Sequence, residues 1–299
     1  MTKTTRFIPL ALLLAGLTMA GGCDVFEKDD PTGPTPLQAT VNYDAIGASD
    51  TIGYGSSNYC IPFIVPACTT GPGYVQQVTR RLTASGREVT LNNLGVPGAV
   101  LSPETQAMLQ STGGCDGAGF GDICRNVLVD EAPYVRRTST LVTVFIGAND
   151  ANAVGRAIRA GQAGSNPAGF IQDQIQKFGR DIQTMVATVR GRSADARIVV
   201  LNLPNMAATP YAASLSLTEK RVLQQLTVGF SAGINALANQ GVTVIDLMCD
   251  ANFYNPSIFS SDGFHPNDAG YTYLTDRVYA AATGSAPAPR ASCPQMTVF

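Results

Sequence analysis

The feature that most constrains the fold is an alternation of short, continuous apolar runs with longer helical patterns. Five runs rich in β-branched and apolar residues predict strands over Thr40–Ile46, Arg87–Asn92, Leu141–Ile146, Arg197–Leu201 and Val242–Leu247. Several of these runs are apolar at consecutive positions, which indicates burial on both faces, as parallel sheets require. The alternation therefore predicts an α/β fold, a three-layer α/β/α sandwich with a central parallel sheet.

Helix-start and helix-stop signals lie between these runs. Gly73–Ala84 precedes the glycine of a helix end, and Asn166-Pro167 offers a cap and a first-turn proline for a helix to about Val189. Ser216 and Glu219 have capping-box spacing before a helix that ends at Gly241, and a last helix follows Pro266 to about Ala281. In such folds the ligand site lies at the carboxyl ends of the strands.

The first 22 residues have the pattern of a secretory signal peptide. Lys3 and Arg6 form a basic start, an apolar stretch runs from Ile8 to Leu17, and small residues follow it. An uncleaved membrane anchor is the alternative, but the apolar stretch is shorter than the roughly 20 residues that span a bilayer. The chain is thus expected to be exported.

Cys23 follows Ala20-Gly21-Gly22, a sequence that resembles the lipobox of bacterial lipoproteins, in which the cysteine is lipidated. Lipidation would hold the protein on a membrane of the cell envelope, whereas simple cleavage before Cys23 would leave a free thiol. Residues 23–39 then form a disordered tether rich in proline and acidic residues. A folded domain is expected over residues 40–283, with a C-terminal tail over 284–299.

Six further cysteines remain for disulfide bonds, as an even number in an exported protein implies. Sequence alone allows about 15 pairings, of which proximity favours Cys60–Cys68 and Cys115–Cys124, leaving Cys249–Cys293. No pair has the C-x-x-C spacing of a zinc site, so no metal is expected. The formal net charge of −2 gives no electrostatic reason to expect a nucleic-acid partner.

The chain has a single histidine, His265, so any serine–histidine chemistry must use it. Asp262 lies three residues before it in Ser261-Asp262-Gly263-Phe264-His265-Pro266, where Gly263 and Pro266 mark a loop. Such a loop can fold the Asp262 carboxylate back onto one ring nitrogen and leave the other to accept a proton from a serine. A lone histidine is more often structural, and it is this context that favours catalysis.

The motif Asp-x-x-His-Pro near the C-terminus resembles the last conserved block of the SGNH (GDSL-like) hydrolase family. The family's first block, usually Gly-Asp-Ser-Leu, corresponds here to Gly47-Ala48-Ser49-Asp50. The resemblance implies a flavodoxin-like fold and a serine esterase or lipase in which Ser49 is the nucleophile and Asp262 and His265 complete the triad. Ala48 and Asp50 depart from the usual residues, which leaves the subfamily open.

Two further blocks supply the donors that the resemblance implies for the oxyanion. The second block fits Asn92–Gly98, with Gly95 as the glycine whose N–H binds the oxyanion, and the third, Gly-x-Asn-Asp, fits Gly147–Asp150 with Asn149. The implied oxyanion hole is therefore Ser49 N–H, Gly95 N–H and the Asn149 side chain. Taken singly, a glycine or an Asn-Asp pair after a strand is more often a turn or a helix cap.

Alternatives to the esterase remain. The family includes thioesterases and carbohydrate deacetylases, and a non-catalytic ligand-binding lipoprotein on the same fold is a third interpretation. Gly229–Gly233 spells the G-x-S-x-G motif, but Ser231 lies within a helical pattern with no strand before it, so it is not the expected nucleophile. The expected partners are an ester substrate and a membrane, without cofactor, in a monomer.

The apolar segment from Tyr59 to Cys68 follows the proposed nucleophile. It includes Phe63 and Ile64, and its two end cysteines can close it as a loop. It is expected either to form an acyl-binding wall or to be ordinary core packing.

Overall fold

A five-stranded parallel sheet forms the centre of the fold. The computed structural model describes residues 37–61, 68–115, 124–284 and 286–299. The strands are β1 (Thr40–Gly47), β2 (Glu88–Asn93), β3 (Leu141–Phe145), β4 (Arg197–Leu201) and β5 (Thr243–Ile245), in the order β2-β1-β3-β4-β5. Every adjacent pair is parallel, and β1 pairs with β2 on one side and β3 on the other. The predicted α/β/α fold is confirmed.

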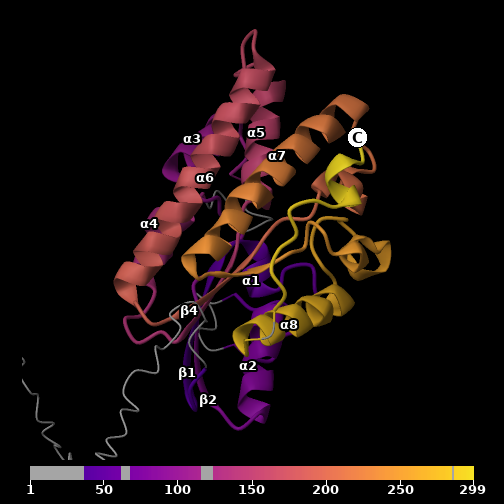
Figure 1. Ribbon diagram of the computed structural model, residues 1–299. Helices are drawn as coiled ribbons and strands as arrows, with labels where there is room; N and C mark the ends of the chain where they lie inside the picture. Colours follow the sequence, from indigo (N-terminus) through magenta and orange to yellow (C-terminus); the bar gives the residue numbers. More distant parts are fainter. Residues whose placement is uncertain (1–36, 62–67, 116–123, 285) are drawn as a thin grey trace, which may run out of the picture. The chain divides into compact units, whose positions relative to one another are not determined.

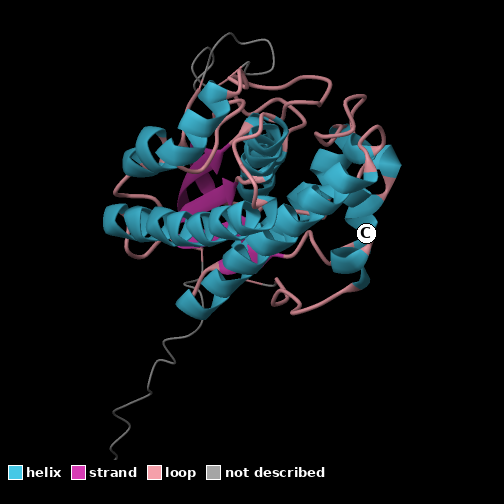
Figure 2. Cartoon of the chain, turned by 90° about the horizontal axis from the view of Figure 1, so that it is seen from above, coloured by secondary structure: helices cyan, strands magenta, loops and turns pink. Residues whose placement is uncertain are grey.

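Helices cover both faces of this sheet (Figures 1 and 2). From β1 the chain first moves to β2 at one edge of the sheet, and all later connections move toward β5 at the other edge. Because crossovers are right-handed, the helix between β1 and β2 lies on the opposite face from the helices that connect β2 to β3, β3 to β4 and β4 to β5. That helix, α2 (Tyr74–Ala84), packs against α8 (Asp268–Ala282). The opposite face carries α3 (Pro103–Ser111), α5 (Ala148–Arg159), α6 (Pro167–Arg192) and α7 (Leu217–Asn235). Two helices are only one turn long: α1 (Ser49–Ile52) directly follows β1, and α4 (Val127–Asp130) lies between α3 and β3.

Local capping signals account for the predicted helix starts. Ser216 and Glu219 form a reciprocal capping box at α7, and the Asn166 side chain accepts a hydrogen bond from Gly169 N–H at the start of α6. The predicted end of α7 at Gly241 is too late, because the helix tightens into a 3₁₀ turn over Ala236–Gln240. The helices α3 and α5 were not among the predicted elements.

The sheet ends earlier at β5 than the apolar run suggests. The Asn202 side-chain oxygen, just beyond β4, accepts hydrogen bonds from the N–H groups of Leu247 and Met248 at 2.7 and 3.0 Å. These bonds draw the chain out of the ladder after Ile245. The other strand boundaries agree with the prediction within about two residues.

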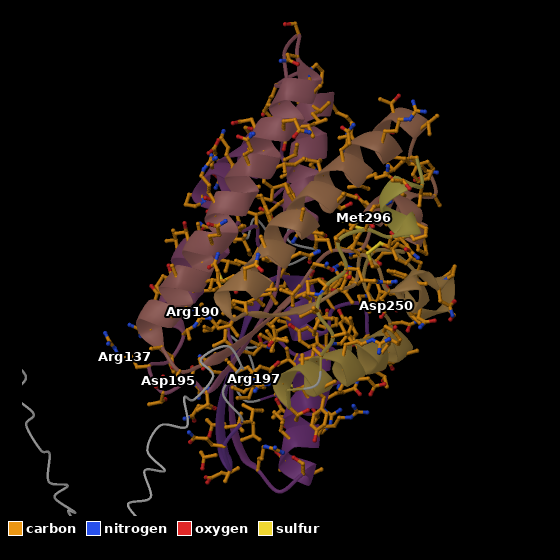
Figure 3. The ribbon with its side chains drawn as sticks, viewed as in Figure 1. Arg137, Arg190, Asp195, Arg197, Asp250 and Met296 are labelled. Atoms are coloured by element: carbon orange, nitrogen blue, oxygen red, sulfur yellow. A yellow bond between two sulfur atoms is a disulfide. The ribbon has the colours of Figure 1, made fainter. Side chains whose placement is uncertain are left out.

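Arg197 connects the sheet to the helix layer that α8 occupies (Figure 3). It is the first residue of β4, only 5% exposed, and its Nη1 donates to Ala281 O at the end of α8 at 3.0 Å. Burial lowers the pKa of this guanidinium. The contact satisfies a helix-terminal carbonyl and places a cation at the negative end of the helix dipole.

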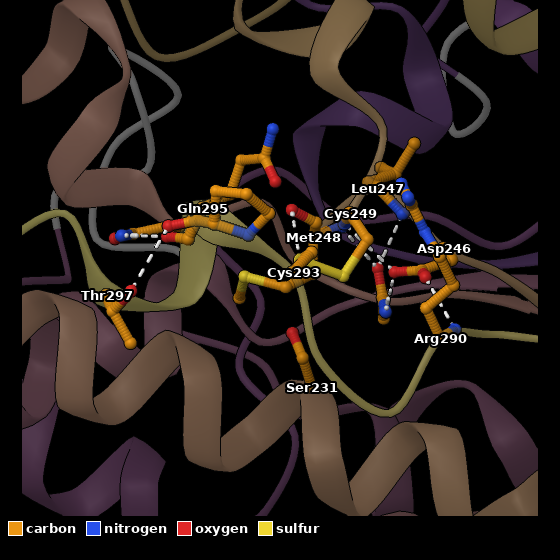
Figure 4. Close-up of a disulfide and its surroundings, with 12 residues drawn as sticks. Ser231, Asp246, Leu247, Met248, Cys249, Arg290, Cys293, Gln295 and Thr297 are labelled. Atoms are coloured by element: carbon orange, nitrogen blue, oxygen red, sulfur yellow. Dashed lines mark hydrogen bonds between the residues drawn. A yellow bond between two sulfur atoms is a disulfide. The ribbon is translucent and has the colours of Figure 1, made fainter.

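Three disulfides join Cys60 to Cys68, Cys115 to Cys124 and Cys249 to Cys293, the pairing that proximity favours. The last bond fastens the C-terminal segment beside the end of β5 (Figure 4). There Arg290 N–H donates to Asp246 at 2.9 Å, and the Val298 and Phe299 N–H groups donate to Gln224 of α7. The segment after Thr283 is therefore held against the domain at several points.

No helix in the described part of the chain combines the length and apolar character needed to cross a bilayer. Cys23, Phe63 and Ile64 lie outside the described residues, so the lipidation site and the centre of the 59–68 loop stay predictions.

The long disulfide is expected to stabilise the domain more than a short one. Because Cys249 and Cys293 are 44 residues apart and Cys115 and Cys124 only 9, the entropy model gives losses of about 4 and about 3 kcal/mol for the two double Cys→Ser variants. Urea denaturation of both variants beside the parent measures the difference. A larger loss for the 115–124 variant would contradict the model.

Candidate active site

A glycine at the end of β1 makes the turn that presents Ser49. Gly47 has φ of +136°, and a Cβ there would lie 2.2 Å from the Phe145 carbonyl oxygen. Only glycine can adopt this conformation so close to a neighbouring strand. Ala48 N–H donates to the same Phe145 oxygen at 3.2 Å. These contacts place Ser49 as the first residue of α1, with 3% of its surface exposed.

Glu131 supports this turn from beneath, and no sequence pattern marked it. Its Oε2 accepts the Gly47 N–H at 2.6 Å, and the residue is completely buried. Burial raises the pKa of the Glu131 carboxyl well above its ordinary value, against the opposing effect of the Gly47 hydrogen bond. Glu131 therefore satisfies a backbone donor two residues before Ser49. Glu131 lies in the connection between β2 and β3, 84 residues after Gly47, so a local motif could not reveal the contact.

Ser49, His265 and Asp262 form a continuous line of hydrogen bonds. Ser49 Oγ lies 2.8 Å from His265 Nε2, and His265 Nδ1 lies 2.6 Å from Asp262 Oδ2. The second carboxylate oxygen accepts from Ser260 Oγ and from the N–H groups of Phe264 and His265, at 2.7 to 3.0 Å. The three residues that the sequence singled out are thus brought together, although 216 positions separate Ser49 from His265.

Partial burial by itself would raise the pKa of the Asp262 carboxyl, but hydrogen bonds from His265 and Ser260 outweigh that effect. The pKa of Asp262 consequently lies well below its usual range. An ionised Asp262 keeps the proton of His265 on Nδ1 and leaves Nε2 as an acceptor for the Ser49 hydroxyl. This arrangement can take up a proton from Ser49 when its oxygen attacks a carbonyl.

Aromatic rings hold the imidazole in place. Tyr54 and Phe264 each meet the His265 ring edge-on, with centroids 4.7 Å apart in both pairs. Tyr54 also contacts Tyr59 at 5.2 Å, where the disulfide-closed loop begins. The ring is only slightly exposed, so its orientation is set by packing as well as by Asp262.

Asn149 and Ser49 line the same small pocket at the ends of β1 and β3. Asn149 belongs to the first turn of α5, and its Nδ2 donates to Ala99 O at 2.9 Å, which uses one of its two N–H bonds. As the first residue of α1, Ser49 has an N–H group that the helix itself leaves unbonded. Both groups are therefore available as donors beside the Ser49 hydroxyl.

Gly95 differs from the sequence expectation. Its N–H donates to the Asn93 side chain at 3.0 Å, and a Cβ there would lie 2.6 Å from Thr51. The Gly95 N–H is therefore occupied by a local turn rather than free for a substrate oxygen. Gly98 lies three residues later and has φ of +76°. Among the described residues no acceptor binds its N–H. The next residue, Ala99, accepts the hydrogen bond from the Asn149 side chain.

Asp150 joins this loop to α5. Its Oδ1 accepts Leu101 N–H at 2.9 Å, and it is 1% exposed. Burial raises the pKa of Asp150 to about 7, although the hydrogen bonds from the Leu101 and Asp150 N–H groups oppose the shift. The Asp of the Gly-x-Asn-Asp block thus positions the segment that faces Asn149.

The sequence matches the model of the GDSL-like lipase/acylhydrolase family over residues 45–273. The chain belongs to this family. It is accordingly an ester hydrolase of the GDSL type, and the match spans every block described above.

Solved structures agree with the fold of this GDSL-like hydrolase. The lipase Lip_vut3 from a goat rumen metagenome has a TM-score of 0.54 at 17% identity, covering 82% of this chain and 98% of its own. The extracellular lipase of Streptomyces rimosus has a TM-score of 0.53 at 18% identity, covering 81% and 99%. At these identities the likeness concerns the fold. No curated protein matches the sequence.

Ser231, the serine of the G-x-S-x-G motif, is buried within α7 of this hydrolase. Its hydroxyl donates to Leu203 O at 3.0 Å and accepts from Leu203 N–H at 3.1 Å. Both bonds fasten the loop after β4 to α7. A serine committed in this way, with no strand before it, packs the helix against the sheet and does not form a nucleophile elbow.

The buried Asp150 is expected to make stability depend on pH. The pKa of Asp150 is raised from 3.8 to about 7 in the folded state. Between these pH values the folded protein keeps the proton and the unfolded chain releases it. The free energy of unfolding therefore falls as pH rises from 3.8 to about 7. Asp150→Asn keeps the acceptor for Leu101 but cannot titrate. Its stability relative to the parent should rise across this window, by at most about 1.4 kcal/mol per pH unit.

The measurement is urea unfolding of parent and variant at closely spaced pH values. Asp50 and Glu131 also titrate, and they are common to both proteins, so the difference isolates Asp150. A difference that is constant between pH 4 and 7 would contradict the prediction.

Proposed function

We propose that this protein hydrolyses carboxylic esters through an acyl-enzyme formed on Ser49, with His265 as general base and Asp262 orienting it. The observation that carries the proposal is the unbroken line from Ser49 Oγ to His265 Nε2 at 2.8 Å and from Nδ1 to Asp262 at 2.6 Å. Membership of the acylhydrolase family supports the same reaction class.

In the proposed mechanism, Ser49 Oγ attacks the ester carbonyl while its proton passes to His265 Nε2. The imidazolium is stabilised by the ionised Asp262, and it then protonates the leaving alcohol. A water molecule, activated by the same imidazole, attacks the acyl-serine and releases the acid. The proton of Ser49 leaves with the alcohol, and the proton that His265 takes from the water passes to Ser49 Oγ when the acid is released. The enzyme thus regains its starting protonation state, and these steps use no cofactor.

The donors proposed for the tetrahedral oxyanion are Ser49 N–H, Gly98 N–H and the free N–H of the Asn149 amide. Gly98 replaces Gly95 in this set because the Gly95 N–H is taken by Asn93. Preorganised donors of this kind stabilise negative charge that develops only in the transition state.

Acyl esters and lipids are the proposed substrates. An apolar pocket lies next to the one that contains Ser49, and it favours an apolar acyl group over a sugar as the acid part of the ester. Its lining includes Phe145, Leu203, Met206, Phe253 and Phe259. A thioester or an acetylated carbohydrate would require the same chemistry. A ligand-binding lipoprotein without catalysis is disfavoured by the intact hydrogen-bond line.

Export and attachment through a lipidated Cys23 are part of the proposal. The three disulfides among the described residues support an oxidising compartment, since such bonds are rare in the cytosol. Anchoring on the bacterial cell envelope would bring the site close to membrane lipids. The protein is proposed to act as a monomer.

The proposed nucleophile can be tested with a fluorophosphonate probe and p-nitrophenyl acetate, butyrate and palmitate. The parent protein should be labelled and should turn over the esters, and Ser49→Ala should lose both. His265→Ala should lose turnover by about 10⁴-fold or more. Ser231→Ala is the matched control and should keep the label. Labelling that survives in Ser49→Ala would contradict the assignment.

The Asn149 amide is expected to act in the transition state. Asn149→Ala should lower kcat by about 10²- to 10³-fold with a much smaller change in KM. Steady-state kinetics on p-nitrophenyl butyrate measures both, and circular dichroism checks folding, because the variant also loses the Ala99 hydrogen bond. A rise in KM of about 10²- to 10³-fold with kcat unchanged would show that Asn149 acts in substrate binding instead.

A further inference from the structure

Asp50 is the residue of the site that neither the triad nor the oxyanion donors use. It follows Ser49 directly, at the position where the Gly-Asp-Ser-Leu block usually has leucine. The side chain is 8% exposed, so a carboxyl group is buried where an apolar group is usual. Burial of a carboxyl costs free energy unless hydrogen bonds or an opposite charge compensate for it.

The compensation that the described residues give Asp50 is small. Its Oδ1 lies 3.3 Å from the Tyr271 hydroxyl, and that hydroxyl lies 2.5 Å from Tyr54 O. A phenol has one proton, and the shorter contact takes it. In the part of the chain that the structure describes, Asp50 forms no ion pair with Lys or Arg and no other side chain donates to it. The carboxyl therefore retains the capacity to bind another donor.

Asp50 is a lining residue of two adjoining pockets. Asp50 lines the small pocket that contains Ser49 and Asn149, and it also lines the apolar pocket next to it. The two pockets share Phe145, Ala148, Leu203 and Phe264 as well. Asp50 follows Ser49 directly and lines both pockets, so an acyl chain that extends from Ser49 into the apolar pocket runs beside Asp50 near the ester carbonyl.

From these contacts we propose that Asp50 is a specificity-determining residue that selects acyl groups carrying a hydroxyl on carbon 2 or 3. The inference rests on the proposed function, because it places the acyl carbonyl at Ser49. The hydroxyl donates to the Asp50 carboxyl, while the rest of the acyl group occupies the apolar pocket. An unsubstituted alkyl chain would remove water from the carboxyl and return no hydrogen bond.

A hydroxyl fits this position better than an ammonium group. An ammonium would have to lose its hydration in a pocket lined mainly by aromatic and aliphatic side chains. It would also lie near His265, which becomes positively charged when it accepts the Ser49 proton. His265 Nε2 lies 2.8 Å from the hydroxyl of Ser49, the residue next to Asp50, so an ammonium beside Asp50 would face this positive charge.

The test compares kcat/KM for ethyl 2-hydroxybutyrate and ethyl 3-hydroxybutyrate with that for ethyl butyrate, measured by pH-stat titration. The parent should prefer at least one hydroxy ester by about tenfold or more. Asp50→Leu should lower this preference by about ten- to a hundredfold, the effect of one hydrogen bond to a charged group. Asp50→Ala should do the same if the leucine variant folds poorly, and Asp50→Asn should retain part of the preference.

Tyr271→Phe is the matched control, because it removes the hydroxyl next to Asp50 and keeps the carboxyl. The preference should survive in this variant. An equal loss in Tyr271→Phe would show that Asp50 acts through the Tyr271–Tyr54 contact, and an unchanged preference in Asp50→Leu would likewise overturn the inference. Fluorophosphonate labelling separates the two levels: labelling through Ser49 without hydroxy preference overturns this inference alone, and absence of labelling and turnover overturns the esterase proposal with it.

Discussion

The pairing of β1 with both β2 and β3 is the constraint on which the candidate active site depends. Because β1 is interior, the backbone at Gly47 is fixed by β3 on one side, where Phe145 O accepts the Ala48 N–H. On the other side Val96 N–H donates to Gly47 O, which brings the loop after β2 alongside. The turn that carries Ser49 is therefore held from both neighbours before any side chain of the site contributes.

The histidine side of the site is fixed by different contacts. The loop that carries Asp262 and His265 precedes α8, and α8 is held by its packing on α2 and by the bond from Arg197 to its last turn. Gly263 fits against the backbone of Pro210 and Tyr211, so the loop after β4 limits it on the other side. The distance from Ser49 to His265 is consequently set by the whole sheet and its helices rather than by local chain geometry.

Much of this arrangement could be predicted from the sequence, and the reasons differ between residues. Strands β3 and β4 were recognisable because both of their faces are buried. The proposed triad could be named because the chain has a single histidine. We propose Gly98 in place of Gly95 as an oxyanion donor, because the Asn93 side chain, two residues earlier, accepts the Gly95 N–H. Neither composition nor motif spacing can show which of two glycines in one loop keeps a free N–H. Glu131 was missed because its partner, Gly47, is 84 residues away.

Four carboxyl groups are buried within β1 or in the segments next to β1 and β3, and their compensation differs. Asp44 pairs with Arg136 at 3.0 Å and contacts Asn92 and Ser139. Glu131 and Asp150 each accept a backbone N–H, at 2.6 and 2.9 Å, and each fastens a segment of the site.

Asp50 alone among these four has neither a cation nor a backbone donor from another residue, and its contact with Tyr271 is long, at 3.3 Å. Burial raises the pKa of the Asp50 carboxyl, because the ionised form loses hydration that its few hydrogen bonds do not replace. The other three carboxyls are explained by the fold that they hold together. Asp50 is compensated little by the fold, follows the proposed nucleophile and lines its pocket, which is why we propose that it contacts the bound acyl group.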